Sequence, residues 1–399
     1  MNTRAIAGPS LTELAPAQSD VANMTTRTDG LFLLNNLGVG GSERKIVRLA
    51  NRLKDEGVHV SLVSLNGPYT IEQGIRRDVP LKKLERRGKF SLRALLLLRE
   101  IIVRERPSTI LAVNLYQALY VALAASLLPY RPRTVALVNT STFRGHRMMK
   151  RLYQAVLGRF DLTVHGSDAQ RQFWLKAGQR APDNSTVIYN GVDSDHFEAT
   201  GSFEAAKRLR ASLGLKPDSF LVGTVGRLAP EKNHEVLLTS LRRLRVARVD
   251  AHLVLAGGGP LREQLLRRAR DLAIADRVHF IGEIDDVRPV LAALDVFVLP
   301  SVAVESFSNA ALEAMSMGRP VILSNIGGAR EMIQDGVEGY VVSHTELAAR
   351  LPAILSALYA DKRKRQLMGV AARARAVSCF SVPAMVAGYR GLLNNGDLQ

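Results

Sequence analysis

The sequence predicts an α/β fold built from two doubly wound halves. Short apolar runs rich in β-branched or aromatic residues alternate with longer segments of helical periodicity, which is typical of parallel sheets with crossover helices. This alternation occurs twice, on either side of a turn-rich segment at residues 187–197 (VIYNGVDSDHF). The chain has 399 residues, 47% of them hydrophobic, so it can bury the cores of two domains.

Five segments of the first half have the pattern of buried strands: 31–36, 59–65, 109–114, 134–139 and 162–166. The first helix between them is predicted to begin at a Ser42 cap and to end at Gly57. The second half repeats the pattern, with strands predicted at 220–226, 252–257, 278–282, 296–301 and 320–325. Because open α/β sheets bind ligands beyond the carboxyl ends of their strands, we expect the functional residues to follow these strands.

The domain boundaries follow from this organisation. Residues 1–28 are rich in Ala, Ser and Thr and lack the features of a secretory signal, so we interpret them as a flexible leader. We expect Rossmann-like domains at 29–189 and 190–378, and a C-terminal helix at 379–399 that packs back on the N-terminal domain. The single cysteine, Cys379, excludes a disulfide framework, and no apolar run approaches the roughly 20 residues of a membrane span. These features indicate a cytoplasmic protein.

The net charge of +17 is concentrated in the first half. Residues 1–190 hold 28 basic and 14 acidic residues, whereas 191–399 hold 26 and 23. Such a basic half can be a solvated surface, or it can face an anionic membrane or a lipid-linked acceptor. Nucleic acid is not expected as a partner because the sequence has no base-stacking clusters and no nucleic-acid motifs. The amphipathic run at 91–104 is interpreted either as a core-facing helix or as a membrane contact.

Glycines follow the first predicted strand, in LGVGGSERK. Gly38, Gly40 and Gly41 open the first helix, so the backbone there can approach a phosphate or an acceptor closely. The third glycine of the dinucleotide fingerprint is missing, so the alternative of a tight structural turn stays open. The glycines at 257–259 allow the same two interpretations.

Two cations and two carboxylates follow strands of the second half. Arg227 and Lys232 suit a diphosphate, which a guanidinium can clamp and an ammonium can neutralise. Glu305 lies in the loop after the strand at 296–301, and Glu313 lies about one turn into the next helix, where it can accept both hydroxyls of a ribose. Ser306 and Ser308 can cap that helix, and free N–H groups near Phe307 and Ser308 would attract an anion.

Taken in order, these motifs resemble glycosyltransferase family 4, whose members are retaining enzymes of the GT-B fold, with two Rossmann-like domains facing a central cleft. The resemblance covers roughly residues 31–395 and is carried by NLGVGGSER, NGVD, RLAPEKN, ESFSNAALEAMSMGRPVI and GGAREMIQDGVEGYVV. It implies a hexosyltransferase that uses a nucleotide-diphosphate sugar, such as a UDP- or GDP-sugar, as its donor. No cofactor and no metal ion are expected.

The resemblance also implies roles for individual residues. Glu305 would contact the donor sugar and Glu313 the ribose, while Arg227 and Lys232 would hold the diphosphate; Glu305, Arg227 and Lys232 are the catalytic candidates. The further donor-binding candidates are Gly40, Gly41, Ser306, Phe307, Ser308 and Asn309. The N-terminal domain would bind the acceptor and the C-terminal domain the donor.

One position departs from the family pattern. Many members have a histidine after the fourth N-terminal strand, where this chain has Asn139 and Thr140, and His146 is offset from that position. Whether Asn139 or Thr140 replaces the histidine is open. Asp193 and Asp195 lie in the linker, where a structural role is favoured over metal binding.

The function expected from the resemblance is transfer of a sugar to a lipid-linked or growing glycan acceptor. Such a reaction belongs to the biosynthesis of cell-surface polysaccharide, lipopolysaccharide or glycolipid, at the inner face of the plasma membrane. Two alternatives remain at this point: a nucleotide-sugar epimerase or hydrolase of the same fold, and a noncatalytic protein that binds nucleotide sugars or nucleic acid.

Overall fold

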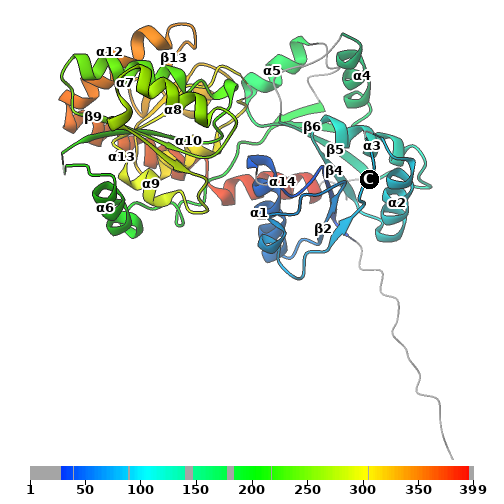
Figure 1. Ribbon diagram of the computed structural model, residues 1–399. Coiled ribbons are helices and arrows are strands. Elements are labelled where there is room, and N and C mark those ends of the chain that lie inside the picture. Colours follow the sequence, from blue (N-terminus) through cyan, green and yellow to red (C-terminus); the bar gives the residue numbers. More distant parts are fainter. Residues whose placement is uncertain are drawn as a thin grey trace, which may run out of the picture.

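The computed structural model describes residues 28–38, 40–88, 90–139, 147–177, 184–216, 218–303 and 305–394. The leader predicted at 1–28 lies outside the described residues except for Thr28. The chain forms two parallel sheets with helices on both faces of each (Figure 1). The predicted α/β class is therefore confirmed.

The N-terminal half is built on a seven-stranded parallel sheet of order β3-β2-β1-β4-β5-β6-β7. Its strands are β1 Gly30–Leu34, β2 Val60–Ser64, β3 Leu81–Lys83, β4 Thr109–Val113, β5 Arg133–Val138, β6 Leu162–His165 and β7 Ser185–Val187. Its helices are α1 Gly41–Asp55, α2 Leu92–Glu105, α3 Leu115–Ala125, α4 Arg147–Leu157 and α5 Asp168–Lys176, with a short 3-10 helix η1 at Glu72–Gly74. Apolar residues of α2, α3 and α4 form one core cluster with this sheet, and those of α1 form another.

The second half is built on a six-stranded parallel sheet of order β10-β9-β8-β11-β12-β13. Its strands are β8 Phe220–Val225, β9 Ala251–Ala256, β10 Val278–Gly282, β11 Val296–Leu299, β12 Val321–Ser324 and β13 Gly339–Val342. Its helices are α6 Phe203–Ser212, α7 Glu235–Val246, α8 Arg262–Asp271, α9 Arg288–Ala293, α10 Asn309–Ser316, α11 Ala329–Met332, α12 Leu347–Ala360 and α13 Lys362–Cys379, with 3-10 helices η3 Thr200–Ser202, η4 Pro230–Lys232 and η5 Ala275–Arg277. Residues of α7, α8 and α12 pack on one face of the sheet, and those of α9 and α10 on the other.

All ten predicted strands are present, with ends shifted by a few residues. Sequence reasoning missed β3, β7 and β13, which are edge strands of three or four residues. A strand this short shows little periodicity, and an edge strand needs less apolar sequence than a central one.

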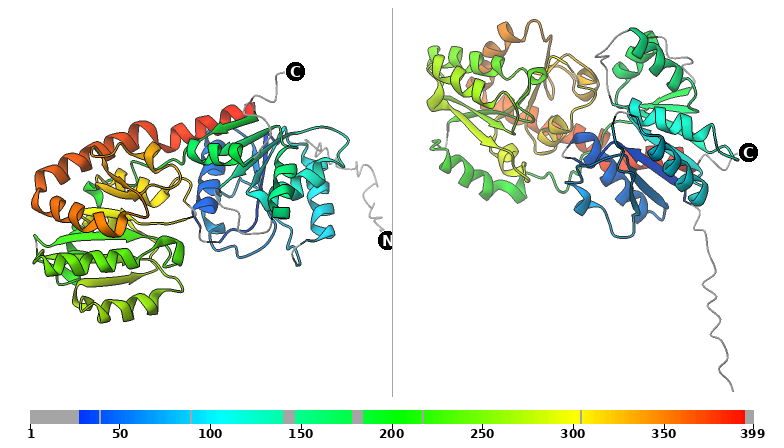
Figure 2. Two further views of the ribbon diagram at one scale, coloured as in Figure 1. Left: turned by 90° about the horizontal axis from the view of Figure 1, so that it is seen from above. Right: turned by 45° about the vertical axis from the view of Figure 1, so that its right-hand side comes forward.

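The last helix crosses from the second half back to the first. Helix α14, Val382–Asn394, contributes Met385, Val386 and Tyr389 to the core cluster that includes β1 and α1. Figure 2 shows the C-terminal helices, coloured orange to red, running along one side of both halves. Where α14 begins, the Val192 N–H donates to the carbonyl of Phe380, at 2.8 Å, and the Val382 N–H donates to that of Val192, at 3.1 Å. The two segments that connect the halves, the linker and the start of α14, thus lie next to each other and are hydrogen-bonded.

Gly191 allows this close crossing. A Cβ atom there would lie 2.7 Å from Val382 Cα and 2.8 Å from the Ser381 carbonyl oxygen, both of which are backbone atoms. We therefore expect Gly191→Ala to lower the free energy of unfolding by about 1–3 kcal/mol through overpacking, measured by urea denaturation. The control is Gly201→Ala, because no atom lies within 4 Å of a Cβ at Gly201. Equal stability of the two variants would contradict this account of the crossing.

Candidate functional site

The loop between β11 and α10, residues 300–308, together with α10 itself, carries six of the ten predicted site residues. Ser308 caps α10, because its Oγ accepts a hydrogen bond from the Ala311 N–H at 3.3 Å. The helix ends at Ser316 with Met317 as its C-cap, and Gly318 follows with a left-handed φ of +70°. The N–H groups at the very start of α10 have no acceptor within the helix, so they are available to an anion.

Two glycines after β12 hold this loop in place. The Gly328 N–H donates to the Ser306 carbonyl at 2.8 Å. A Cβ on Gly327, whose φ is +54°, would lie 2.2 Å from the Glu305 carbonyl oxygen, and one on Gly328 would lie 2.7 Å from the Phe307 ring. The turn after β12 therefore requires glycine, because its backbone packs directly against the β11–α10 loop and leaves no room for a Cβ atom.

Lys232 and Glu305 form an ion pair. The Lys232 Nζ donates to Glu305 Oε1, and the Ser301 Oγ donates to the same oxygen at 3.0 Å. Both charged side chains are largely buried, with 24% of Lys232 and 13% of Glu305 exposed. The pair connects the segment after β8 with the β11–α10 loop. The structure thus brings together two of the three residues predicted to be catalytic.

Arg227 lies in the same segment but has another partner. Its Nη2 donates to Glu231 Oε1 at 2.5 Å, and 68% of its side chain is exposed. Two glycines after β9 pack against the backbone on either side of Arg227: a Cβ on Gly257 would lie 2.1 Å from the Gly226 carbonyl oxygen, and one on Gly259 would lie 2.5 Å from that of Leu228. The turn after β9 therefore supports the backbone that carries Arg227.

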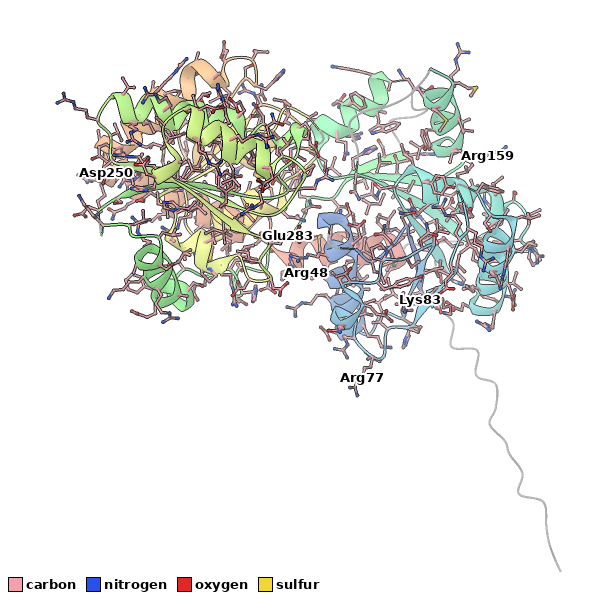
Figure 3. The ribbon with its side chains drawn as sticks, viewed as in Figure 1. Arg48, Arg77, Lys83, Arg159, Asp250 and Glu283 are labelled. Atoms are coloured by element: carbon pink, nitrogen blue, oxygen red, sulfur yellow. The ribbon has the colours of Figure 1, made fainter. Side chains whose placement is uncertain are left out.

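Glu313 lies on α10 and faces the first half of the molecule. Burial raises the pKa of its carboxyl from 4.5 to about 7, while Arg48 and Arg44 of α1 act in the opposite direction and lower this pKa. Arg48, labelled in Figure 3, projects from α1, and its Nη1 donates to the Gly191 carbonyl at 3.5 Å. The carboxyl is therefore only partly ionised near neutral pH.

The predicted glycine loop meets the β11–α10 loop. Gly40 precedes α1 in an extended conformation, with φ −150° and ψ 157°, and a Cβ there would lie 2.2 Å from Glu43 Oε2. The Asn309 side chain donates to the Gly41 carbonyl at 3.3 Å. The carboxyl ends of β1 and β11 thus lead to residues in direct contact, as expected for a ligand site between facing sheets.

The predicted Ser42 cap is wrong. Helix α1 begins at Gly41, without a side-chain cap, so Ser42 lies inside the first turn. Its Oγ instead accepts a hydrogen bond from the Asn139 side chain, at 3.1 Å. Asn139 is thereby held at the end of β5 beside the glycine loop. Thr140 and His146 lie outside the described residues.

Sequence reasoning missed one residue at the site, Ser301, and one buried cation on α1, Lys45. Ser301 ends the segment VFVLPS, and its position after a strand is the signal that could have identified it. Lys45 lies on α1 and is buried, and this burial lowers the pKa of its ammonium to about 8. Lys45 shares a helix face with Leu49, so its burial follows from the periodicity of α1.

Asp193 of the linker has structural partners. Asp193 pairs with Arg52 at 3.5 Å and accepts a hydrogen bond from the His196 N–H at 3.2 Å. Among the described residues, no group of three or more His, Cys, Asp or Glu side chains could hold a metal ion.

Comparisons with known proteins match each half of the chain to a glycosyltransferase family model. The model of Glycosyltransferase Family 4 matches residues 39–196, and that of Glycosyl transferases group 1 matches residues 219–361. A GDP-mannose-dependent alpha-(1-6)-phosphatidylinositol monomannoside mannosyltransferase of Mycolicibacterium smegmatis is 37% identical over 191 residues, 46% of this chain. That alignment spans 49% of the relative, and one with an uncharacterized glycosyltransferase of Methanocaldococcus jannaschii spans 40%, so the chain matches about half of these proteins or less.

A longer match and a solved structure extend the likeness to most of the chain. The lipopolysaccharide core biosynthesis glycosyltransferase LpsE of Rhizobium meliloti is 28% identical over 365 residues, 89% of this chain and 96% of that protein. The crystal structure of Anabaena HepE in complex with UDP has a TM-score of 0.81 at 23% identity, covering 92% of this chain and 99% of HepE. This likeness shows the GT-B fold. With both family models matched in order along this fold, the chain belongs to glycosyltransferase family 4.

Proposed function

We propose that the protein transfers a sugar, with retention, from a nucleotide-diphosphate sugar to a lipid-linked or growing glycan acceptor. The observation that carries the proposal is the Lys232–Glu305 pair beside the open N–H groups at the start of α10. These groups offer a cation and a helix N-terminus to a diphosphate, and a carboxylate to a sugar hydroxyl.

We propose that donor binding separates the Lys232–Glu305 ion pair and gives each side chain a new partner on the donor. Lys232 would leave Glu305 for a phosphate oxygen, and Arg227 would join it, because Arg227 is exposed enough to turn from Glu231. Glu305 would then accept hydrogen bonds from the sugar. As the bond between sugar and phosphate breaks, negative charge develops on the diphosphate, and the two cations and the start of α10 stabilise it.

The two glutamates are assigned to orientation of the donor. Glu305 already accepts two hydrogen bonds, and Glu313 has the raised pKa of a buried carboxyl beside α1. We assign Glu305 to the sugar and Glu313 to the ribose. A covalent glycosyl-enzyme, as formed by retaining glycosidases, is not part of this proposal.

The related proteins suggest substrate classes. One is named a GDP-mannose-dependent mannosyltransferase, another a lipopolysaccharide core glycosyltransferase, and HepE was solved with UDP. We therefore propose a UDP- or GDP-sugar as the donor and a glycan or glycolipid of the cell surface as the acceptor. A screen of nucleotide sugars for thermal stabilisation tests the donor, because selective binding raises the melting temperature.

Asn139, at the position of the family histidine, favours a second candidate function: binding of a nucleotide sugar without transfer. Incubation with radiolabelled donors, with and without a broad panel of acceptors, separates the possibilities. Label transferred to an acceptor supports the transferase, whereas donor converted without any acceptor indicates an epimerase or hydrolase. Binding without any turnover supports the second candidate.

Removal of the cation pair tests the diphosphate clamp. We expect Arg227→Ala combined with Lys232→Ala to lower kcat at least about 10²-fold, because the leaving group loses its stabilising charges. The control is Lys207→Ala with Arg208→Ala, which removes two exposed cations from α6. Initial transfer rates measure the effect. Near wild-type rates for the first variant would rule out the assigned clamp.

The pKa of Glu313 predicts how donor affinity depends on pH. The ionised carboxylate accepts hydrogen bonds from both ribose hydroxyls, whereas the protonated carboxyl, populated below a pKa of about 7, has lost one of these acceptor sites. Donor affinity should therefore rise as pH increases through about 7, and Glu313→Gln should remove this dependence. Calorimetric titrations with a nucleoside diphosphate between acidic and alkaline pH measure it. The same pH profile in both proteins would exclude this role.

The N-terminal half exposes apolar side chains beside cations. The predicted amphipathic run forms α2, whose inner face is buried, but Leu92 and Leu96 remain 63% and 53% exposed. On α4, Met148 and Leu152 are exposed near Lys150. No helix in the described part of the chain is long and apolar enough to span a bilayer. We propose that these exposed residues contact an anionic membrane on the inner face of the plasma membrane.

Vesicle flotation tests the membrane contact. We expect more protein to float with anionic than with neutral vesicles, and Leu92→Ser with Leu96→Ser to reduce this fraction, because both leucines would insert between headgroups. The control is Val246→Ser, which removes an apolar side chain of similar exposure, 66%, from the second half. Equal flotation with both vesicle types would exclude the proposal.

A further inference from the structure

The first turn of α5 receives a carboxylate from the other half of the molecule. The N–H groups of Asp168 and Ala169 donate to the two oxygens of Glu331, at 2.7 and 2.9 Å. The next N–H, that of Gln170, donates to the Ser167 Oγ at 3.2 Å. Every N–H of this first turn therefore has an acceptor, and two of the three are supplied by Glu331 of α11.

A third donor reaches the same carboxylate. The Tyr189 hydroxyl, at the end of the N-terminal half, donates to Glu331 Oε2 at 3.0 Å. Burial and the adjacent Glu331 carboxylate raise the pKa of Tyr189 to about 12, so this hydroxyl stays protonated as a donor. A carboxylate with three donors at a helix N-terminus forms stronger hydrogen bonds than a neutral acceptor would.

Helix α11 is fixed to the second half. The Arg375 side chain of α13 donates to the Glu331 and Met332 carbonyls, at 2.9 and 2.8 Å. The turn before α11 holds the β11–α10 loop through the bond from Gly328 to Ser306, and a Cβ on Gly328 would lie 2.7 Å from Ser167 Cβ. One short segment, residues 327–332, therefore contacts both the loop of Glu305 and helix α5.

We propose that Glu331 is a positioning residue that sets the placement of the acceptor half against the β11–α10 loop. The inference rests on the proposed transfer reaction, in which the N-terminal half presents the acceptor to the donor sugar. Without the carboxylate, two N–H groups of α5 lose their acceptor, and the halves lose three of the hydrogen bonds that join them. Donor binding should persist because the proposed diphosphate contacts lie within the second half.

Substitutions at both ends of the contact test it. Glu331→Ala removes the carboxylate, and Glu331→Gln replaces one oxygen with a donor that faces other donors. Asp168→Pro removes one N–H while keeping α5, because Ser167 is extended, with φ −159° and ψ 159°, and the first helical position accepts proline. Asp168→Ala retains the N–H and is its matched control. Arg330→Ala changes an exposed neighbour on α11 and controls for Glu331.

The primary measurement is the distance between spin labels on the two halves, by double electron–electron resonance. Labels are attached at Arg93→Cys on α2 and Arg242→Cys on α7, both exposed positions, in a Cys379→Ser background. We expect Glu331→Ala and Asp168→Pro to shift or broaden the distance distribution, Glu331→Gln to have a smaller effect, and both controls to match the parent. A parental distribution in Glu331→Ala or in Asp168→Pro would overturn the proposal.

Kinetics on the same variants link the contact to the reaction. We expect kcat to fall by about 10²-fold in Glu331→Ala and Asp168→Pro, as for a misplaced reactant, with the Kd for a nucleoside diphosphate unchanged. An unchanged kcat, or a Kd that rises with the fall in kcat, would contradict a positioning role. The distance measurement needs no turnover, so failure of the proposed function and failure of this inference can be told apart.

Discussion

The contact between the turn after β12 and the loop after β11 is the constraint on which the site depends. Backbone meets backbone there: the Gly327 position leaves no room for a Cβ beside the Glu305 carbonyl, and the Gly328 N–H is bonded to Ser306. Two parallel strands can therefore present their loops as one rigid unit. Within this unit, Glu305 pairs with Lys232 of the second half, and Glu331 accepts hydrogen bonds from α5 of the N-terminal half.

The two cations of the candidate site are paired with carboxylates. Lys232 is paired with Glu305 and Arg227 with Glu231, so each of these two cations already has a carboxylate as its partner. Binding of a diphosphate then becomes an exchange of partners, and the desolvation of the ammonium has already occurred during folding. Such preorganisation suits a reaction in which charge develops on a leaving group.

The sequence was sufficient to predict the central strands and to select candidate residues in the loops that follow them. Lys232, Glu305 and Asn309 could be selected as candidate site residues because each comes after an apolar strand, where parallel sheets bind their ligands. Ser42 was misassigned because a serine near a helix start has the same pattern whether it caps the helix or accepts from a distant Asn139. Glu331 was missed because its partners, Asp168 and Ala169, lie more than 160 residues away and contribute only backbone N–H groups.

The edge strands β3, β7 and β13 could not be predicted for a similar reason. They are defined by hydrogen bonding to a neighbouring strand rather than by a local sequence pattern. The family resemblance supplied the roles proposed for Glu305 and Glu313, whereas the geometry supplied the ion pair and the contact between the halves. The pKa of Glu313, raised by burial to about 7, depends on tertiary packing and has no signal in the sequence.

The most direct test of the exchange at Lys232 is a crystal structure with a nucleoside diphosphate bound. The account predicts that the Lys232 Nζ lies within hydrogen-bond distance of a phosphate oxygen, that the phosphates face the start of α10, and that Glu305 has separated from Lys232. A diphosphate bound elsewhere, with the Lys232–Glu305 pair intact, would contradict it.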